Sequence, residues 1–247
     1  MRSFGVTDVG KKRKLNQDYL FYSDEPVGCF PNLYIVADGM GGHKAGDKAS
    51  SYAVTRFVEL AKKTEPGHPF RIMEELIIKV NAEVFRISCQ QEEYAGMGTT
   101  FVAATVVDQT VYVMNVGDSR LYFYDGESLR QVTMDHSLVE ELVRAGELAP
   151  QESRNHPQKN IITRAIGVYE NITPDFFKIP MKKNQKILLC SDGLSNMVDD
   201  EMLEQILSDG GNIEEEAEHC KREALFFGGI DNIAVVIAQM EDRGCAQ

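Results

Sequence analysis

The chain lacks the cysteine pattern of a disulfide scaffold or of a zinc site. No two of its five cysteines have Cys-x-x-Cys spacing, and the count is odd: Cys29, Cys89, Cys190, Cys220 and Cys245. No two histidines have the helical spacing of a zinc pair. Secreted scaffolds need paired cysteines, and zinc sites recruit Cys or His. We therefore expect a protein of a reducing compartment without a zinc site.

Long apolar runs and an excess of positive charge are also missing. No run approaches the ~18 apolar residues that span a bilayer, and residues 1–10 lack the apolar segment of a secretory signal. A formal net charge of -12 opposes binding to nucleic acid or to an anionic membrane. No linker or repeat divides the 247 residues. We expect one soluble, cytoplasmic, monomeric domain spanning residues 1–247.

The glycine-rich segment 38–50 lacks the key residues of a nucleotide loop. A Walker loop that used Gly41 and Gly46 would have Asp47 where its lysine belongs, and that negative charge would repel phosphate. The dinucleotide fingerprint fails as well, because Lys44 stands where a third glycine is needed. The glycines then serve to let the backbone approach an ion closely, which makes the Gly39 carbonyl a candidate ligand.

What the sequence does contain is a set of aspartates at the tips of apolar runs. Asp38, Asp118 and Asp192 follow short runs rich in Val, Ile and Leu, and Asp231 precedes another. Such runs, bounded by turn residues, are typical of buried strands. Carboxylates that meet at strand ends need raised pKa values or a cation. An all-oxygen ligand set without a calcium-loop spacing favours Mg²⁺ or Mn²⁺.

Taken one at a time, these features have simpler interpretations. Asp-Gly is a common turn dipeptide, and we interpret Asp125-Gly126 as a hairpin turn between two short strands. The basic run Lys11–Lys14 is by default a solvated loop. Asp38, Asp192 and Asp231 differ because all three lie at the ends of apolar runs, and their joint occurrence favours a shared site.

Periodicity predicts an α+β protein in which helices cover antiparallel sheets, since Asp108–Thr110 and Asp125-Gly126 join consecutive strands as hairpins. We expect a mobile flap over residues 145–160, a polar segment with two prolines. The apolar spacing predicts helices over residues 49–60, 70–87, 138–145, 202–207 and 213–227. The predicted strands cover residues 4–7, 19–22, 33–37, 100–107, 111–116, 121–124, 129–132, 174–179, 186–190 and 233–239.

Eight motifs follow one another along the chain: Arg13-x-x-Asn16-Gln17-Asp18, Val36–His43 (VADGMGGH), Gly98-Thr99-Thr100, Gly117-Asp118-Ser119-Arg120, Asp135-His136-Ser137, Thr163–Gly167, Cys190–Leu194 and Asp231-Asn232. In this order they resemble the motif series of the PPM/PP2C metal-dependent serine/threonine protein phosphatases, in the bacterial branch that consists of the catalytic domain alone. The resemblance covers essentially the whole chain and implies a four-layer α-β-β-α sandwich with a metal centre at one edge.

The resemblance also implies which residues hold the ions. Asp38 matches the ligand that bridges two Mg²⁺ or Mn²⁺ ions, the Gly39 carbonyl completes the first site, and Asp192 and Asp231 complete the second. Asp118, with Asp192, matches a third and weaker site in bacterial relatives. The simpler interpretation of Asp118 is a turn cap that pairs with Arg120.

Other positions match roles around the ions. Arg13 matches the arginine that binds substrate phosphate, and Asp18 matches an acidic residue that orders metal-bound waters. Gln17 stands where many relatives carry Glu, so we assign it no charge role. Met40 replaces the histidine proposed as general acid in eukaryotic members, and a metal-bound water is the acid we expect. We interpret His43 as structural.

The remaining histidines in the motifs and the flap, His136 and His156, are also interpreted as structural. The implied reaction is hydrolysis of phosphoserine or phosphothreonine by a water that bridges the metal ions, without a phosphoenzyme. The partners would be phosphoproteins, including a cognate serine/threonine kinase. Two alternatives remain: a non-catalytic regulatory module of the same fold, which should have lost a core aspartate or the arginine, and a two-metal nuclease, which the acidic charge opposes.

Overall fold

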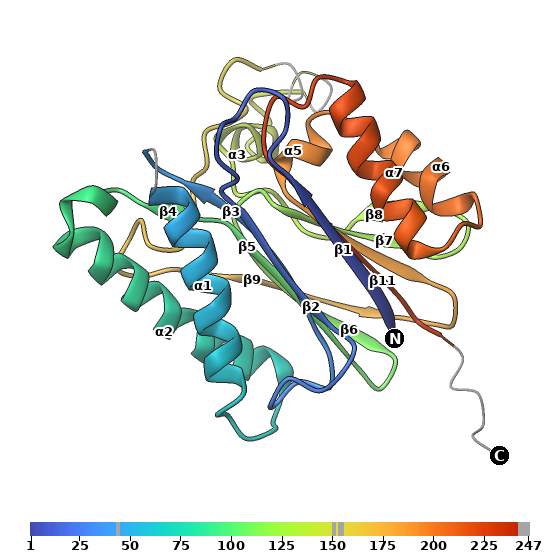
Figure 1. Cartoon of the computed structure of the whole chain (residues 1–247), viewed down its shortest axis with the longest axis horizontal. Helices are drawn as coiled ribbons and strands as arrows, with labels where there is room; N and C mark the ends of the chain where they lie inside the picture. The colour runs from blue at the N-terminus through green and yellow to red at the C-terminus, as the bar shows by residue number, and fades with distance from the viewer. Residues whose placement is uncertain (43–44, 150–151, 153–155, 242–247) are drawn as a thin grey trace.

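Two antiparallel sheets pack face to face between two layers of helices (Figure 1). The structure is a computed structural model, and it describes residues 1–42, 45–149, 152 and 156–241. The first sheet has the order β1-β11-β10-β7-β8, with strands Arg2–Asp8, Ile233–Gln239, Lys186–Cys190, Arg120–Tyr124 and Leu129–Gln131. The second has the order β2-β3-β5-β6-β9, with strands Asp18–Ser23, Leu33–Met40, Phe101–Val107, Thr110–Val116 and Asp175–Pro180, and the short β4 (Gly98–Thr99) pairs with β3.

Helices cover the outer face of each sheet. On the second sheet lie α1 (Ala45–Ala61) and α2 (Pro69–Gln90), followed by the 3-10 turn η1 (Glu92–Tyr94). On the first sheet lie α5 (Asp192–Ser195), α6 (Asp200–Ser208) and α7 (Ile213–Phe226). A further helix, α3 (Leu138–Arg144), begins at Ser137, whose hydroxyl caps it by accepting from the Glu140 amide. The fold is the α+β sandwich predicted from the sequence.

Three apolar layers hold the four structural layers together. Strand side chains alternate between them: Leu189 of β10 packs between the sheets, whereas Leu188 packs under α6 and α7. On β5, Val102 faces the other sheet and Phe101 faces α1. Both faces of these central strands are therefore buried, which explains why their sequences are continuously apolar instead of alternating.

The predicted strands and helices all occur, with shifts of a few residues at their ends. The hairpin at Asp108 and Gln109 is a tight one in which both residues have positive φ, 47° and 60°. At the other predicted turn, the Asp125 carboxylate accepts from the amides of Glu127 and Ser128. The sequence did not reveal β4, η1 or α5, because two to four residues are too few to show a period.

The predicted flap lies partly outside the described residues, since residues 150–151 and 153–155 fall within it. The described residues after it return to the body of the protein: Leu138 donates its amide to Ile161, and Ser137 forms a bridge with Ile162. The flap and the boundaries 1–247 remain predictions. Among the described helices, none is long and apolar enough to cross a membrane.

Candidate active site

The structure brings five aspartates from both sheets to one end of the sandwich. Asp38, at the end of β3, lies opposite Asp18 in the register of β2 and β3. The Asp38 carboxyl lies close enough to those of Asp18 and Asp192 to affect the pKa of each. Asp118 and Asp231 also act on its charge. The convergence predicted from the strand ends is therefore present in the fold.

Burial and mutual repulsion disfavour the ionised form of four carboxyl groups, those of Asp18, Asp38, Asp118 and Asp192. Burial raises the pKa of Asp38 well above its ordinary value, and the neighbouring charges, led by Asp18, raise it further. Burial likewise raises the pKa of Asp18 to about 8, although the hydrogen bond from Ser191 acts against the shift. The pKa values of Asp118 and Asp192 are raised for the same reason. A divalent cation would relieve this repulsion at neutral pH.

The donor chemistry of the cluster fits such a cation. Asp18 Oδ1 and Asp192 Oδ1 are buried without a hydrogen-bond partner, so each has an unused acceptor. Ser191 Oγ donates to the other Asp18 oxygen at 2.6 Å. Within the described part of the chain, however, no three Asp, Glu, His or Cys side chains are already arranged around one point as ion ligands. One oxygen of Asp231 is bound by Arg13.

The backbone at Asp38 and Gly39 is held tightly. Thr100 Oγ1 accepts from the Asp38 amide at 2.8 Å, and the Asp38 carbonyl accepts from Thr99 Oγ1 at 2.9 Å. A Cβ atom at Gly39 would lie 2.1 Å from the Gly46 carbonyl oxygen. Only glycine fits there, so the end of β3 can pack directly against the first turn of α1.

Arg13 reaches the cluster from the loop between β1 and β2. Its Nη2 donates to Asp231 Oδ2 at 2.8 Å, and this hydrogen bond raises the pKa of the guanidinium. Half of the side chain, 52%, is exposed, so N–H groups remain free for a ligand. Asn232 fixes the loop by donating to the carbonyls of Val9 and Leu15 at 2.9 and 3.0 Å. The basic run is thus tied to the site, which its charge pattern alone did not indicate.

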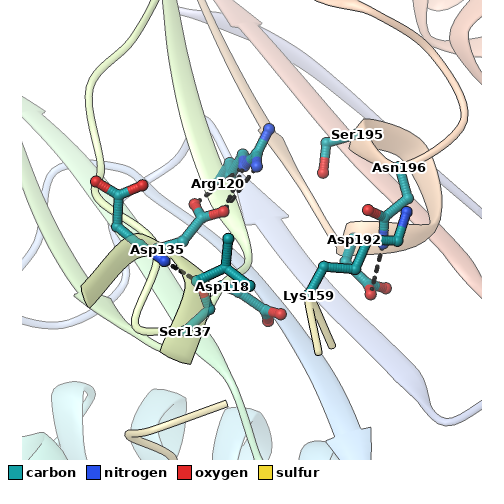
Figure 2. A pocket seen from close by; sticks show the side chains of 10 residues that line it. Asp118, Arg120, Asp135, Ser137, Lys159, Asp192, Ser195 and Asn196 are labelled. Atoms are coloured by element: carbon teal, nitrogen blue, oxygen red, sulfur yellow. Dashed lines mark hydrogen bonds and ion pairs between the residues drawn. The ribbon is translucent and has the colours of Figure 1, made fainter. Parts of the chain in front are cut away.

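Asp118 and Asp192 face a small polar cavity of ≈ 90 Å³ beside the cluster (Figure 2). Asn196, one turn along α5, donates to Asp192 Oδ2 at 2.9 Å. Lys159 also lines the cavity, and Figure 2 shows it beside Asp192. Asp118 is only 8% exposed and burial is the largest cause of its raised pKa.

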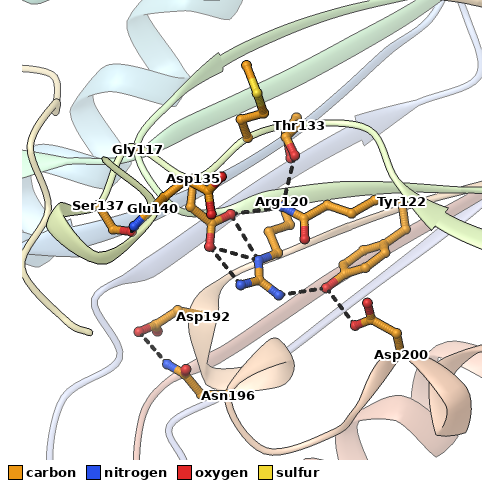
Figure 3. Close-up of polar contacts among 12 residues, drawn as sticks. Gly117, Arg120, Tyr122, Thr133, Asp135, Ser137, Glu140, Asp192, Asn196 and Asp200 are labelled. Atoms are coloured by element: carbon orange, nitrogen blue, oxygen red, sulfur yellow. Dashed lines mark hydrogen bonds and ion pairs between the residues drawn. The ribbon is translucent and has the colours of Figure 1, made fainter. Parts of the chain in front are cut away.

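Arg120 forms the rear wall of this cavity, and the expected alternative that it pairs with Asp118 is wrong. Its Nε and Nη2 bind both oxygens of Asp135, at 2.7 to 3.1 Å, and Nη1 donates to the Tyr122 hydroxyl (Figure 3). That hydroxyl in turn donates to Asp200 at the start of α6. The guanidinium fork is therefore used by the bidentate pair, and Asp118 keeps its carboxylate free toward the cavity.

His136 and His156, interpreted from the sequence as structural, each accept a hydrogen bond from a backbone amide. His136 Nδ1 accepts from the Gly117 amide at 3.1 Å, so the proton lies on Nε2, which faces Asp175 at 3.0 Å. His156 Nδ1 accepts from the Gln158 amide. Met40 ends β3 without a proton to give. His43 lies outside the described residues.

Several residues that orient the site had no role assigned from the sequence. Most of them lie within the motifs but act on a partner far away along the chain, as Ser191 does on Asp18 and Asn232 on Gln17. Asn196 instead acts on Asp192, four residues before it. The residues missed in this way are Thr99, Thr100, Ser191, Asn196 and Asn232.

Known proteins share both the sequence and the fold. The serine/threonine phosphatase stp of Listeria monocytogenes is 40% identical over 244 residues, covering 95% of this chain and 94% of its own. The structure of Staphylococcus aureus serine/threonine phosphatase Stp1 superposes with a TM-score of 0.90 at 32% identity, over 97% and 95% of the two chains. The catalytic domain of the phosphatase PstP, in complex with two manganese ions, gives 0.86 at 29% identity, over 98% of each chain. Residues 10–225 match the protein phosphatase 2C family, and with this coverage the chain belongs to that family.

Proposed function

We propose that this protein hydrolyses phosphoserine and phosphothreonine in proteins and releases inorganic phosphate, with divalent metal ions as cofactors. The observation that carries the proposal is a cluster of aspartates at one end of the sandwich, to which Arg13 is bound. The cluster consists of Asp18, Asp38, Asp192 and Asp231. None of these residues is lost, which opposes a non-catalytic module. The serine/threonine phosphatases of Listeria and Staphylococcus support the substrate class.

Two ions, Mn²⁺ or Mg²⁺, are the cofactors that the donor set favours. Asp38 would be shared by both, with the Gly39 carbonyl on one side and Asp192 and Asp231 on the other. The two manganese ions in the related PstP structure support this count. When bound, such ions lower the pKa of water and neutralise charge on phosphoryl oxygens.

The protein's own groups bind and orient the reactants. Arg13 is placed to bind two phosphoryl oxygens with the N–H groups that its bond to Asp231 leaves free. Asp231 binds one edge of the guanidinium and thereby fixes the direction in which the opposite edge points. Asp18, with its unpaired buried oxygen, is placed to accept a hydrogen bond from water at the centre. Hydrolysis then requires no covalent phosphoenzyme.

Asp118 and Asp192 are proposed to hold a third, weaker ion. Their carboxylates face one cavity, and the guanidinium of Arg120 forms its hydrogen bonds with Asp135 and Tyr122 instead of with Asp118. With only two protein carboxylates, this ion should bind more loosely than the first two. Loss of one metal per chain in Asp118→Asn relative to the wild type, measured by metal analysis at saturating Mn²⁺, would support the site.

The biological setting follows from the same proposal. The substrates would be phosphoproteins, with a cognate serine/threonine kinase among them, encountered by a monomeric domain of residues 1–247 in the cytoplasm. A flap at 145–160 would border the cavity, since Lys159 at its end lines the rim.

The test is phosphate release from a phosphothreonine peptide. We expect release that depends on Mn²⁺ or Mg²⁺, stops with a chelator and is lost in Asp38→Asn. Activity that survives both the chelator and the substitution would contradict the proposal. A nuclease would instead cleave DNA under the same conditions and leave the peptide intact.

A further inference from the structure

Three large apolar side chains are exposed at the end of α7, directly before the candidate site. Phe226, Phe227 and Ile230 are 75%, 52% and 50% exposed. The two phenylalanine rings form an edge-to-face pair with centroids 5.3 Å apart. Single exposed apolar residues are common, but a contiguous group of this size usually marks a contact surface. We call these three residues the aromatic patch.

The aromatic patch is continuous with the site and with the basic loop. Ile230 immediately precedes Asp231, whose carboxylate binds Arg13. The Lys11 amide donates to the Gly229 carbonyl at 2.7 Å, so the segment after α7 lies beside the loop between β1 and β2 (Figure 1). A Cβ at Gly10 would lie 2.1 Å from the Asp231 carbonyl oxygen, which shows how closely the two segments pack.

The charge around the patch is opposite to that of the whole molecule. Lys11, Lys12, Arg13 and Lys14 are all exposed, whereas the formal net charge of the chain is -12. A phosphorylated peptide segment carries about two negative charges on its phosphate alone. The acidic surface elsewhere repels such a segment, and the basic loop attracts it toward this side of the site.

We propose that the aromatic patch and the basic loop together form a docking surface for a substrate segment that carries a large apolar side chain near its phosphorylated residue. The inference rests on the proposed function and adds a specificity to it. The phosphate reaches Arg13, the lysines of the loop attract the anionic segment, and the apolar side chain packs on Phe226 and Phe227. Aromatic residues at the centre of a contact commonly provide most of its binding energy.

The test compares phosphothreonine peptides of equal charge that carry either Phe or Ser two residues from the phosphothreonine, on one side or the other. For the wild-type protein we expect about a tenfold higher kcat/KM for the Phe peptide in at least one pair, in keeping with partial burial of one large apolar side chain. The double variant Phe226→Ser/Phe227→Ser should lose this preference. Its kcat/KM on an aryl phosphate, which has no flanking residues, should change by less than about twofold.

A matched control is Ile78→Ser, which removes an apolar side chain of similar exposure, 48%, from α2. It should keep the preference for the Phe peptide. Equal kcat/KM for both peptides in an active wild-type protein would refute the docking surface alone. A wild-type protein that releases phosphate from none of these substrates would refute the proposed function, and the docking surface with it. A wild-type dimer that the double variant converts to monomer would show that a second copy covers the patch, and would also overturn the proposal.

Discussion

Arg13 and Asp231 show how much of the site is decided by contacts between residues far apart in the chain. They are separated by 218 positions and joined by one 2.8 Å hydrogen bond. The sequence could indicate which residues carry charge near strand ends, because the apolar runs locate those ends. It could not indicate that Ser191 binds Asp18, or that Arg120 prefers Asp135 to Asp118, since those choices depend on side-chain geometry across two sheets.

Arg13→Ala should weaken substrate binding while leaving the fold intact. The lost charge-assisted hydrogen bond is worth about 1.5–3 kcal/mol, which predicts a ten- to hundredfold higher KM. Because the ion pair with Asp231 is half exposed, its loss should cost the fold less than about 1 kcal/mol. Steady-state kinetics with a phosphothreonine peptide and a urea titration measure the two effects. Unchanged kcat and KM would show that Arg13 does not bind substrate and is a solvated loop residue.

Asp38→Asn should separate activity from stability. Removal of the central carboxylate should lower kcat by about a thousandfold or more, since several kcal/mol of charge stabilisation by the ions depends on it. In the presence of a chelator, the variant should unfold at the same or a higher temperature than the wild type. The reason is that the substitution removes a buried carboxyl group whose charge repels the neighbouring carboxylates. The control is Asp125→Asn, the same substitution in the turn between β7 and β8, away from the carboxylate cluster, and it should leave kcat unchanged. A chelated Asp38→Asn protein that melts well below the wild type would contradict the repulsion argument.

At the scale of elements, the strands were predictable because their runs are apolar on both faces and end in turn residues. The short elements were not: β4 and α5 owe their existence to neighbours, β4 to pairing with β3 and α5 to packing against β11. These are also the elements that carry the site, since Thr99 of β4 holds Asp38 and α5 begins at Asp192. Local sequence signals are therefore weakest where the site is built.

His136 should stabilise the link between β6 and the segment before α3. Replacing it with Ala leaves the buried Gly117 amide without its acceptor, which should cost about 1–3 kcal/mol in a urea titration at pH 7.5. Burial lowers the pKa of His136, so the folded protein binds its proton less readily than the unfolded chain. The stability from the neutral ring is present above the unfolded value of about 6.5 and is lost as the pH falls below it.

The matched control for His136 is His219→Ala on α7, where the side chain is 36% exposed. This substitution should change the urea midpoint little. Between pH 7.5 and 5.5, the free energy of unfolding of the wild type should fall relative to that of His136→Ala measured under the same conditions. A larger loss in the variant would mean that the ring is charged in the folded protein.

At the scale of the whole molecule, the metal-free protein should become less stable as the pH rises. The pKa values of Asp18, Asp38, Asp118 and Asp192 are raised above the ordinary value of 3.8, that of Asp18 to about 8. A group whose pKa is raised by folding adds most to the stability of the folded protein at pH values below its unfolded pKa. This added stability disappears as the pH rises through the folded pKa. The chelated protein should therefore have a lower Tm at pH 8.5 than at pH 6.

Divalent ions should reverse this trend, because they bind the ionised carboxylates that repel one another. At a free Mg²⁺ concentration of 100 times Kd, binding stabilises the fold by about 2.7 kcal/mol, which corresponds to roughly 5–10 °C in a domain of this size. We expect the increase in Tm on adding Mg²⁺ to be larger at pH 8.5 than at pH 6, and to shrink in Asp38→Asn. Scanning calorimetry with chelator and with Mg²⁺ at both pH values measures it. An equal increase at the two pH values, or a chelated Tm that rises between them, would mean that the carboxylates are already ionised without a cation, and that repulsion is not what the ions relieve.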